Sequence, residues 1–166
     1  MQVQGTATVL GDDVDTDVIF PARYLAVLRP EDQAKHLFEV LGEEVQNQIK
    51  AGRVIVGGWN FGCGSSREHA VTSMIGAKIE LVIAKSFSRI FFRNAVNNGL
   101  AVVASPEIAQ VLKSDDKITA NLQTGEVHHN GATLKFTPLP TEVLAILTSG
   151  GLWASRKPVT NAGVRA

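Results

Sequence analysis

The segment GWNFGCGSSREHA, residues 58–70, brings together side chains that can do chemistry. Two hydroxyls, Ser65 and Ser66, precede the guanidinium of Arg67, which can hold a carboxylate or phosphate through two parallel hydrogen bonds. The segment starts at the end of a strand-like run, RVIVGG, and continues into a helix-like run, SREHAVTSMIGA. Strand-to-helix loops are where α/β proteins bind ligands, and glycines and a helix start favour an anion. We therefore predict a binding or reaction site here.

Two nucleotide-binding templates fit this segment only in part. Gly57 and Gly62 have the separation of a P-loop, but Cys63 and Gly64 stand where that loop needs Lys and Ser or Thr. In the dinucleotide template, Gly62 and Gly64 fit the first two positions and Arg67 occupies the third, where a glycine is required. Recognition of a carboxylate is therefore favoured over recognition of a nucleotide.

Three alternatives use the same residues. Ser65 and Glu68 have the S-x-x-E spacing of a capping box, which would only satisfy backbone donors. Cys63 with His69 as base would make a stand-alone nucleophile, although a cysteine between glycines is more often inert. A non-catalytic carboxylate-binding module is the third alternative. A second hydroxyl and Arg67 favour the site over the cap, and Glu68 and His69 are predicted to orient the loop.

The other polar segment is GDDVDTDVIFPARYLAV, residues 11–27. Its aspartates alternate partly as in a calcium loop, but the glycine at the sixth place and the distal glutamate are missing, so no metal site is predicted. The segment ends in Arg23, Tyr24 and an apolar run, which would suit a flap that offers one cation and one apolar surface to a ligand. The adjacent histidines His128 and His129 alternate faces of a hairpin, so they and His36 are predicted to be surface residues.

Alternating strands and helices must position these side chains. A period-two pattern predicts a strand over residues 2–10, Pro30 predicts the start of a helix that runs to Gly42, and a short helix follows over residues 43–50. Strands over 53–58, 79–84 and 100–104 then alternate with helices over 66–77 and 86–98, which predicts parallel crossovers. The remaining elements are a helix over 106–113, antiparallel strands over 117–122, 126–129 and 132–136, and a helix over 140–151.

Composition indicates one ordinary globular domain. The chain has 166 residues, 45% apolar and 19% charged, with a formal net charge of zero, which argues against nucleic-acid partners. It lacks a signal-like N-terminus and any apolar run long enough for a bilayer, so no membrane partner and a cytoplasmic location are expected. The single cysteine excludes an internal disulfide and a self-contained thiolate cluster. We predict an α/β domain with a mixed sheet over residues 1–150 and a tail over residues 151–166.

Three segments together resemble a known family: DVDTDVIFPARYL, GWNFGCGSSREHA and AKSFSRIFFRNAVNNGL. They are similar to the small subunits of 3-isopropylmalate dehydratases, which resemble the swivelling domain of aconitase. The resemblance covers roughly residues 1–150 and implies a swivelling β/β/α three-layer domain. It also implies a hydro-lyase subunit of leucine biosynthesis that works with a separate large subunit carrying a [4Fe-4S] cluster. No cofactor is expected on this chain, and self-association of the unpaired chain stays open.

The resemblance also implies roles for individual residues. Ser65 would be the base that removes a proton next to a carboxylate of a small hydroxy-dicarboxylate, and Ser66 and Arg67 would bind substrate carboxylate beside Gly64. Asp17 matches the family's active-site aspartate. The expected contacts to the rest of the substrate come from the flap residues Arg23, Tyr24, Ala26 and Val27.

The flap also bears on substrate choice. Residues after the YL pair face the variable group of the substrate in this family, and a polar or basic residue there resembles homoaconitase. Ala26 and Val27 are apolar and suit an isopropyl group, whereas a third carboxylate would be left unpaired there. Small subunits of citramalate or dimethylmalate hydratases would need the same apolar loop, so they remain alternatives, and the small subunit of a homoaconitase is a further one.

Overall fold

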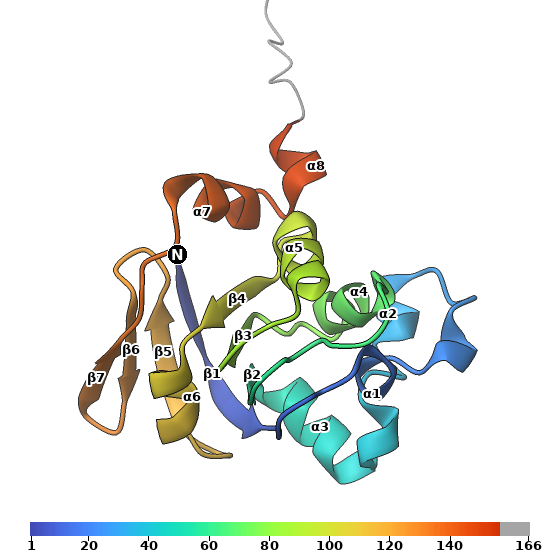
Figure 1. Cartoon of the computed structure of the whole chain (residues 1–166), viewed down its shortest axis with the longest axis horizontal. Coiled ribbons are helices and arrows are strands. Elements are labelled where there is room, and N and C mark those ends of the chain that lie inside the picture. The colour runs from blue at the N-terminus through green and yellow to red at the C-terminus, as the bar shows by residue number, and fades with distance from the viewer. Residues whose placement is uncertain (157–166) are drawn as a thin grey trace, which may run out of the picture.

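A mixed sheet of seven strands forms the centre of the protein in a computed structural model that describes residues 1–156. In chain order the strands are β1 (Gln2–Val9), β2 (Arg53–Gly57), β3 (Leu81–Ala84), β4 (Ala101–Ala104), β5 (Lys117–Asn121), β6 (Glu126–His129) and β7 (Ala132–Lys135). Their spatial order is β4-β3-β2-β1-β5-β6-β7. The sheet curls, so that β5, β6 and β7 turn away from β2 to β4 (Figure 1).

The sheet has a parallel half and an antiparallel half. β1 to β4 pair in parallel with one another, as the alternation of apolar strands and helices predicts. β1 then pairs antiparallel with β5, and β5, β6 and β7 form an antiparallel meander. The turn before β7 has positive φ at both Asn130 and Gly131, as a tight hairpin requires. The predicted α/β fold with a mixed sheet is therefore confirmed.

Alternating residues of the parallel strands build two separate cores. On β2, Ile55 faces one core, whereas Val54 and Val56 face the other; on β3, Val82 and Leu81 divide in the same way. Because side chains of a strand point alternately to its two faces, a sheet covered on both faces needs such continuous apolar runs. The chain supplies these runs and the helices that cover them.

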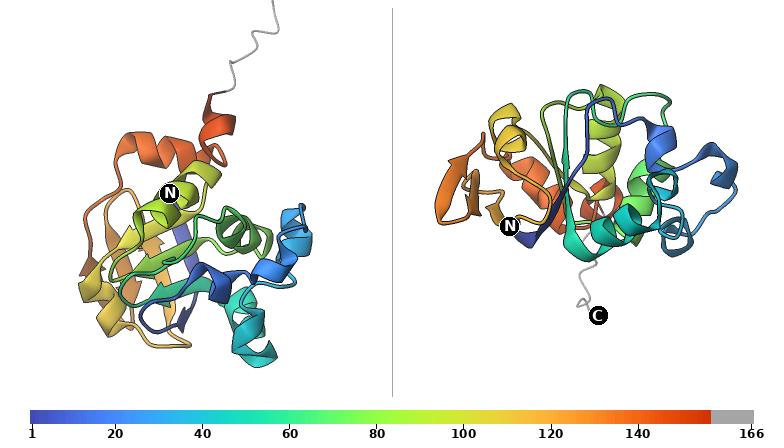
Figure 2. Two further views of the ribbon diagram at one scale, coloured as in Figure 1. Left: turned by 45° about the vertical axis from the view of Figure 1, so that its right-hand side comes forward. Right: turned by 90° about the horizontal axis from the view of Figure 1, so that it is seen from below.

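Eight α-helices and two 3-10 turns occur within residues 1–156, and Figure 2 shows them from two further sides. The helices are α1 (Thr16–Ile19), α2 (Pro30–Gln33), α3 (Glu43–Gly52), α4 (His69–Gly76), α5 (Arg89–Asn98), α6 (Pro106–Val111), α7 (Thr141–Thr148) and α8 (Leu152–Ser155), and the 3-10 turns are η1 (Ala22–Tyr24) and η2 (Glu39–Leu41). The hydroxyls of Ser88 and Ser105 cap α5 and α6, and Gly99 ends α5 with φ of 86°.

The helix predicted from Pro30 to Gly42 is wrong. Only α2 and η2 form there, and Phe38 between them has a left-handed φ of 53°. That conformation buries Phe38 completely and lets its N–H donate to the backbone oxygen of Ile19 at 2.9 Å. The Gln46 amide donates to the backbone oxygens of Lys35 and Leu37, which a continuous helix would have paired internally. Tertiary contacts thus override the local helix signal.

Two further boundaries differ from the predictions. The helix expected from Ser66 begins at His69, and Leu152–Ser155 forms the short helix α8 inside the predicted tail. The rest of that tail, residues 157–166, lies outside the described residues. Within residues 1–156, no helix is long and apolar enough to cross a membrane.

Candidate active site

The loop after β2 runs alongside the chain that leads into α1. The Gly62 N–H donates to the backbone oxygen of Val14 at 2.8 Å, and the Thr16 N–H donates to that of Cys63 at 2.9 Å. The buried Thr16 hydroxyl then donates to the backbone oxygen of Ser65 at 3.2 Å and lies 3.5 Å from the Ser65 hydroxyl. The segment around Thr16 therefore fixes where the predicted serine sits, although the two are 49 positions apart.

Glycine is required at two positions of this loop. Gly62 and Gly64 have φ values of 73° and 90°, which side chains of L-residues rarely adopt. A Cβ at Gly62 would overlap the ring of Phe91, and one at Gly64 would overlap the carboxylate of Asp15. The glycines therefore allow the loop to lie directly against α5 and the start of α1.

Arg67 and Asp17 form an ion pair in the predicted site. Asp17 accepts from the Arg67 guanidinium and, at 3.1 Å, from the backbone N–H of Ala22. The Arg67 side chain is only 16% exposed, whereas Asp17 is 55% exposed. The hydrogen bond from Arg67 lowers the pKa of the Asp17 carboxyl, and the same bond raises the pKa of Arg67. Both groups are therefore charged at neutral pH, and the guanidinium is held in place.

The structure places the other predicted loop residues as follows. Gly64, Ser65 and Ser66 are exposed. Glu68 precedes the first residue of α4, which has no side-chain cap, so the capping box that would have used Ser65 is not formed. His69 stacks on the ring of Phe20, with ring centroids 5.6 Å apart. The serine hydroxyls are thus not committed to capping.

The lone cysteine is poorly suited to be a nucleophile. Burial raises the pKa of the Cys63 thiol, and the nearby carboxylates of Asp15 and Asp13 raise it further. A thiolate is therefore disfavoured in this position. Among residues 1–156, no group of three or more His, Cys, Asp or Glu side chains could hold a metal ion. The described residues therefore do not fit an iron–sulfur cluster, which needs several thiolates.

The acidic segment before α1 has a structural use. Asp12 accepts from the N–H of Trp59 at 2.8 Å, and Asp13 accepts from the side-chain amide of Asn60 at 3.0 Å. These carboxylates tie the start of the loop after β2 to the end of β1. The Asp15 carboxylate caps α1 by accepting from the N–H of Asp17 at 2.7 Å.

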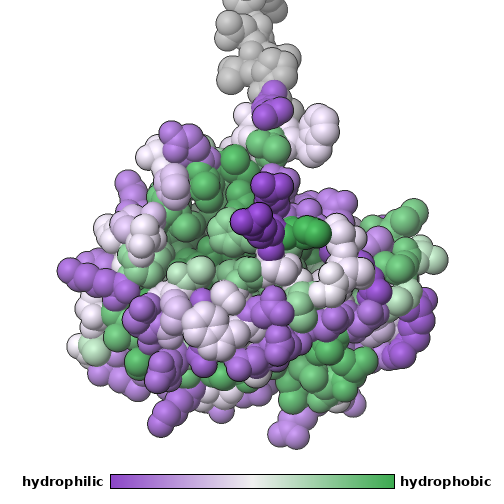
Figure 3. Space-filling model, viewed as in Figure 1, coloured by the Kyte–Doolittle hydropathy of each residue, from purple (hydrophilic) through white to green (hydrophobic). Residues whose placement is uncertain are grey.

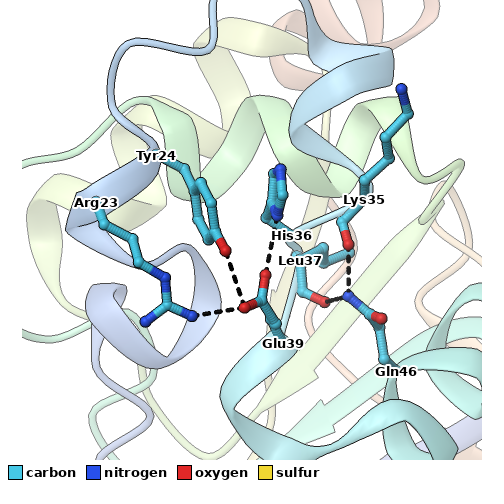
Figure 4. A network of polar contacts seen from close by, with 7 residues as sticks. All are labelled: Arg23, Tyr24, Lys35, His36, Leu37, Glu39 and Gln46. Atoms are coloured by element: carbon cyan, nitrogen blue, oxygen red, sulfur yellow. Dashed lines mark hydrogen bonds and ion pairs between the residues drawn. The ribbon is translucent and has the colours of Figure 1, made fainter.

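Residues 22–29, which we name the flap, follow α1 and contain the four predicted flap residues. Glu39 anchors the first two, Arg23 and Tyr24: its carboxylate accepts from Arg23 at 2.5 Å and from the Tyr24 hydroxyl at 3.0 Å (Figure 4). The same carboxylate lies 2.9 Å from Nδ1 of His36. Tyr24 stacks on His36 with ring centroids 3.6 Å apart. The contact with His36, followed by that with Arg23, lowers the pKa of Glu39 to about 2.

The far part of the flap is apolar and open. Ala26 is exposed and Val27 is half-buried, while Leu25 and Leu28 are 40% and 82% exposed. Figure 3 shows apolar surface at the right-hand edge, where Figure 1 places this segment. The Gln33 side chain holds the flap backbone by donating to the oxygens of Val27 and Leu28.

Sequence reasoning missed four residues that position the site: Thr16, Gln33, Glu39 and Thr72. None carries a local signal, because each acts through partners distant in sequence. Of the three histidines predicted to lie on the surface, His128 is exposed as predicted, whereas His36 and His129 are not. His36 is paired and stacked rather than a free surface residue, and the His129 side chain is only 10% exposed and lies 3.4 Å from Asp116.

Comparison with known proteins places this geometry in a family. The model of the aconitase C-terminal domain matches residues 12–107, which include the flap and the serine loop. The 3-isopropylmalate dehydratase small subunit of Helicobacter hepaticus is 42% identical over 161 residues, which cover 95% of this chain and 98% of the relative. The chain belongs to the 3-isopropylmalate dehydratase small-subunit family. It is thus a member of a family of hydro-lyase subunits related to aconitase.

Other members of the 3-isopropylmalate dehydratase small-subunit family agree in sequence and fold. The isopropylmalate/citramalate isomerase small subunit of Methanocaldococcus jannaschii is 43% identical over 152 residues, covering 90% of each chain. A crystal structure of 3-isopropylmalate dehydratase from the same organism superposes with a TM-score of 0.86, at 39% identity and 93% coverage of both chains. The fold predicted from the family resemblance is thereby confirmed.

Proposed function

We propose that this chain is the small subunit of a dehydratase that interconverts 2-isopropylmalate and 3-isopropylmalate, with Ser65 as the base. The observation that carries this is the joining of two distant segments: Thr16 contacts Ser65, and Asp17 pairs with Arg67. A hydroxyl placed by Thr16 and a guanidinium held by Asp17, two positions apart in sequence, are what proton removal next to a bound carboxylate requires.

Arg67 is the carboxylate-binding group of this proposal. Asp17 fixes one side of its guanidinium, and a planar guanidinium retains donors for a substrate carboxylate. Ser66 and the bare backbone at Gly64 lie next to it in sequence and are exposed. Asp17 acts as a positioning residue for Arg67, and Glu68 and His69 hold the end of the loop at α4.

The exposure of Ser65 supports a role for a second subunit. A serine hydroxyl in water is a poor base, and removal of a proton is favoured only where water is excluded and the developing charge is stabilised. The small-subunit names of the relatives imply a complex, and we propose that a large subunit covers Ser65. The iron–sulfur cluster implied by the family is assigned to that subunit, since the described residues do not fit it. The cytoplasm stays the predicted compartment.

The flap supports an alkyl-substituted substrate. Ala26 and Val27, flanked by the exposed Leu25 and Leu28, offer no partner for a third carboxylate. Homocitrate is therefore disfavoured, in agreement with the relatives' names. Citramalate is the second candidate substrate, because one relative is named an isopropylmalate/citramalate isomerase.

The test is hydratase activity with a reconstituted large subunit, followed by the ultraviolet absorbance of the unsaturated acid. Isopropylmalate, citramalate and homocitrate are compared for the native chain, Ser65→Ala, and Ser149→Ala as a matched serine control at the C-cap of α7. We expect activity that needs both subunits, prefers isopropylmalate, and is lost only in Ser65→Ala. Full activity of Ser65→Ala would refute the assignment of the base, and activity only on homocitrate would refute the substrate.

A further inference from the structure

Gln33 has a buried side chain whose amide nitrogen and oxygen both form hydrogen bonds with residues outside α2. It is 3% exposed. Its Nε2 donates to the backbone oxygens of Val27 at 2.8 Å and Leu28 at 3.4 Å, and its Oε1 accepts from the Thr72 hydroxyl at 2.6 Å. Burying an amide is unfavourable unless its hydrogen bonds are made, so these partners fix the side chain in one arrangement.

These contacts join the flap to the helix that follows the serine loop. Val27 and Leu28 belong to the flap, and Thr72 lies on α4, directly after residues 65–68. The helix that carries Gln33 is seated tightly on α4, since a Cβ at Gly76 would overlap the backbone oxygen of Pro30. A single side chain, that of Gln33, therefore links the flap to α4, and the helix that carries Gln33 is itself packed tightly on α4.

The opposite end of the flap has its own anchors. The N–H of Ala22 donates to Asp17, the partner of Arg67, and Glu39 accepts from Arg23 and Tyr24. The exposed Ala26 lies between the two anchored ends. The position of this apolar stretch relative to the serine loop is thus set from both sides. On the side that includes Val27, the side chains of Gln33 and Thr72 add a link to α4 beyond the backbone hydrogen bonds that join Val27 to Tyr24 and Arg29 to the start of α2.

We propose that Gln33 is a positioning residue for substrate choice, because it fixes the apolar flap relative to the loop of Ser65 and Arg67. This proposal rests on the proposed function. Apolar walls distinguish substrates that differ by methyl groups by roughly 10- to 200-fold, and only if the wall is held in place. A displacement of about 1 Å costs on the order of a hundredfold in a positioned reaction. Gln33 supplies that constraint.

The first test compares two substrates that differ only in the alkyl group. Citramalate carries a methyl group where 2-isopropylmalate carries an isopropyl group. We expect Gln33→Leu to lower the ratio of kcat/KM for isopropylmalate over citramalate by about tenfold, mainly through KM for isopropylmalate. Thr72→Val should lower this ratio too, because it removes the hydroxyl that donates to Gln33, whereas Thr72→Ser keeps a hydroxyl and should have the native ratio. Equal losses on both substrates would show a merely structural role and overturn the proposal.

The matched control is Gln48→Leu on α3. Its side-chain amide also makes a long-range hydrogen bond, to Asp115 at 2.9 Å, but it does not reach the flap. We expect the native substrate ratio for this variant. A shift as large as that of Gln33→Leu would overturn the proposal, because any lost glutamine would then act alike. If Gln33→Leu fails to fold, Thr72→Val and Thr72→Ser carry the same comparison.

A second readout does not depend on activity. Hydrogen–deuterium exchange of residues 22–29 in the full chain should be about tenfold faster in Gln33→Leu than in Gln48→Leu, because local opening no longer breaks the two carbonyl hydrogen bonds. Unchanged exchange would overturn the anchoring role whatever the activity. If Gln33→Leu exchanges faster but the native chain with its large subunit is inactive on every malate derivative, the proposed function is overturned, and the role of Gln33 in substrate choice with it.

Discussion

Substituting Gly62 by alanine should destabilise the protein through two separable effects. The first is the φ of 73°, which costs an alanine about 1–2 kcal/mol. The second is the overlap of the new Cβ with the ring of Phe91, which is 2% exposed and cannot move into solvent. Overpacking of this kind costs about 1–3 kcal/mol. Together the free energy of unfolding should fall by about 2–5 kcal/mol, a large fraction of the ~5–15 kcal/mol typical of a domain.

Two other glycines separate these effects. Gly131 has a φ of 77° but open space around its Cβ position, and Gly11 has open space and no positive φ. In urea unfolding followed by circular dichroism, Gly62→Ala should lose about 1–3 kcal/mol more than Gly131→Ala, whereas Gly11→Ala should be nearly neutral. Any change in unfolded-state entropy is common to all three. Equal losses for Gly62→Ala and Gly131→Ala would refute the packing of the serine loop against Phe91.

Four further predictions concern the site. Arg67→Lys keeps the charge but loses the planar donors, so KM in steady-state assays of the complex should rise about tenfold or more. Asp17→Asn should lower kcat/KM by about tenfold, with little change in Tm because the pair is partly exposed. Cys63→Ala should retain activity within about twofold in the same assay, since the raised pKa of the thiol disfavours a thiolate. Glu39 has its pKa lowered from 4.5 to about 2, so its stabilisation is present above pH 4.5 and is lost as the pH falls towards 2; Glu39→Gln should flatten Tm against pH in that range.

Local signals were sufficient for most of the fold. The apolar runs of β2, β3 and β4 and the short connection between β6 and β7 each depend on neighbouring residues, so the sequence alone predicts these strands. The prediction of a continuous helix over residues 30–42 failed because Leu37 and Phe38 are both fully buried. In a regular helix, the side chains of two such neighbours would point about 100° apart. A left-handed residue at Phe38 resolves that conflict, and no local pattern announces it.

The site shows the same division between local and distant contacts. Ser65, Ser66 and Arg67 adjoin in sequence, so their residue types alone indicate recognition of a carboxylate. The pairing of Arg67 with Asp17 spans 50 positions, and only the family resemblance suggested that Asp17 matters. Gln33 could not be found from sequence, because a buried amide is intelligible only once its partners are known.

The hydrogen bonds around the flap are consistent with the proposed two-subunit enzyme, in which this chain would supply only part of the site. Ordering a backbone costs about 1–2 kcal/mol per residue, and a disordered flap would lose that free energy each time the complex formed. Asp17, Glu39 and Gln33 order the flap within the small subunit, before any partner arrives. In the proposed complex, the binding energy of the large subunit and substrate could then be used to exclude water from Ser65. Loss of one anchor should therefore weaken catalysis more than it weakens the fold.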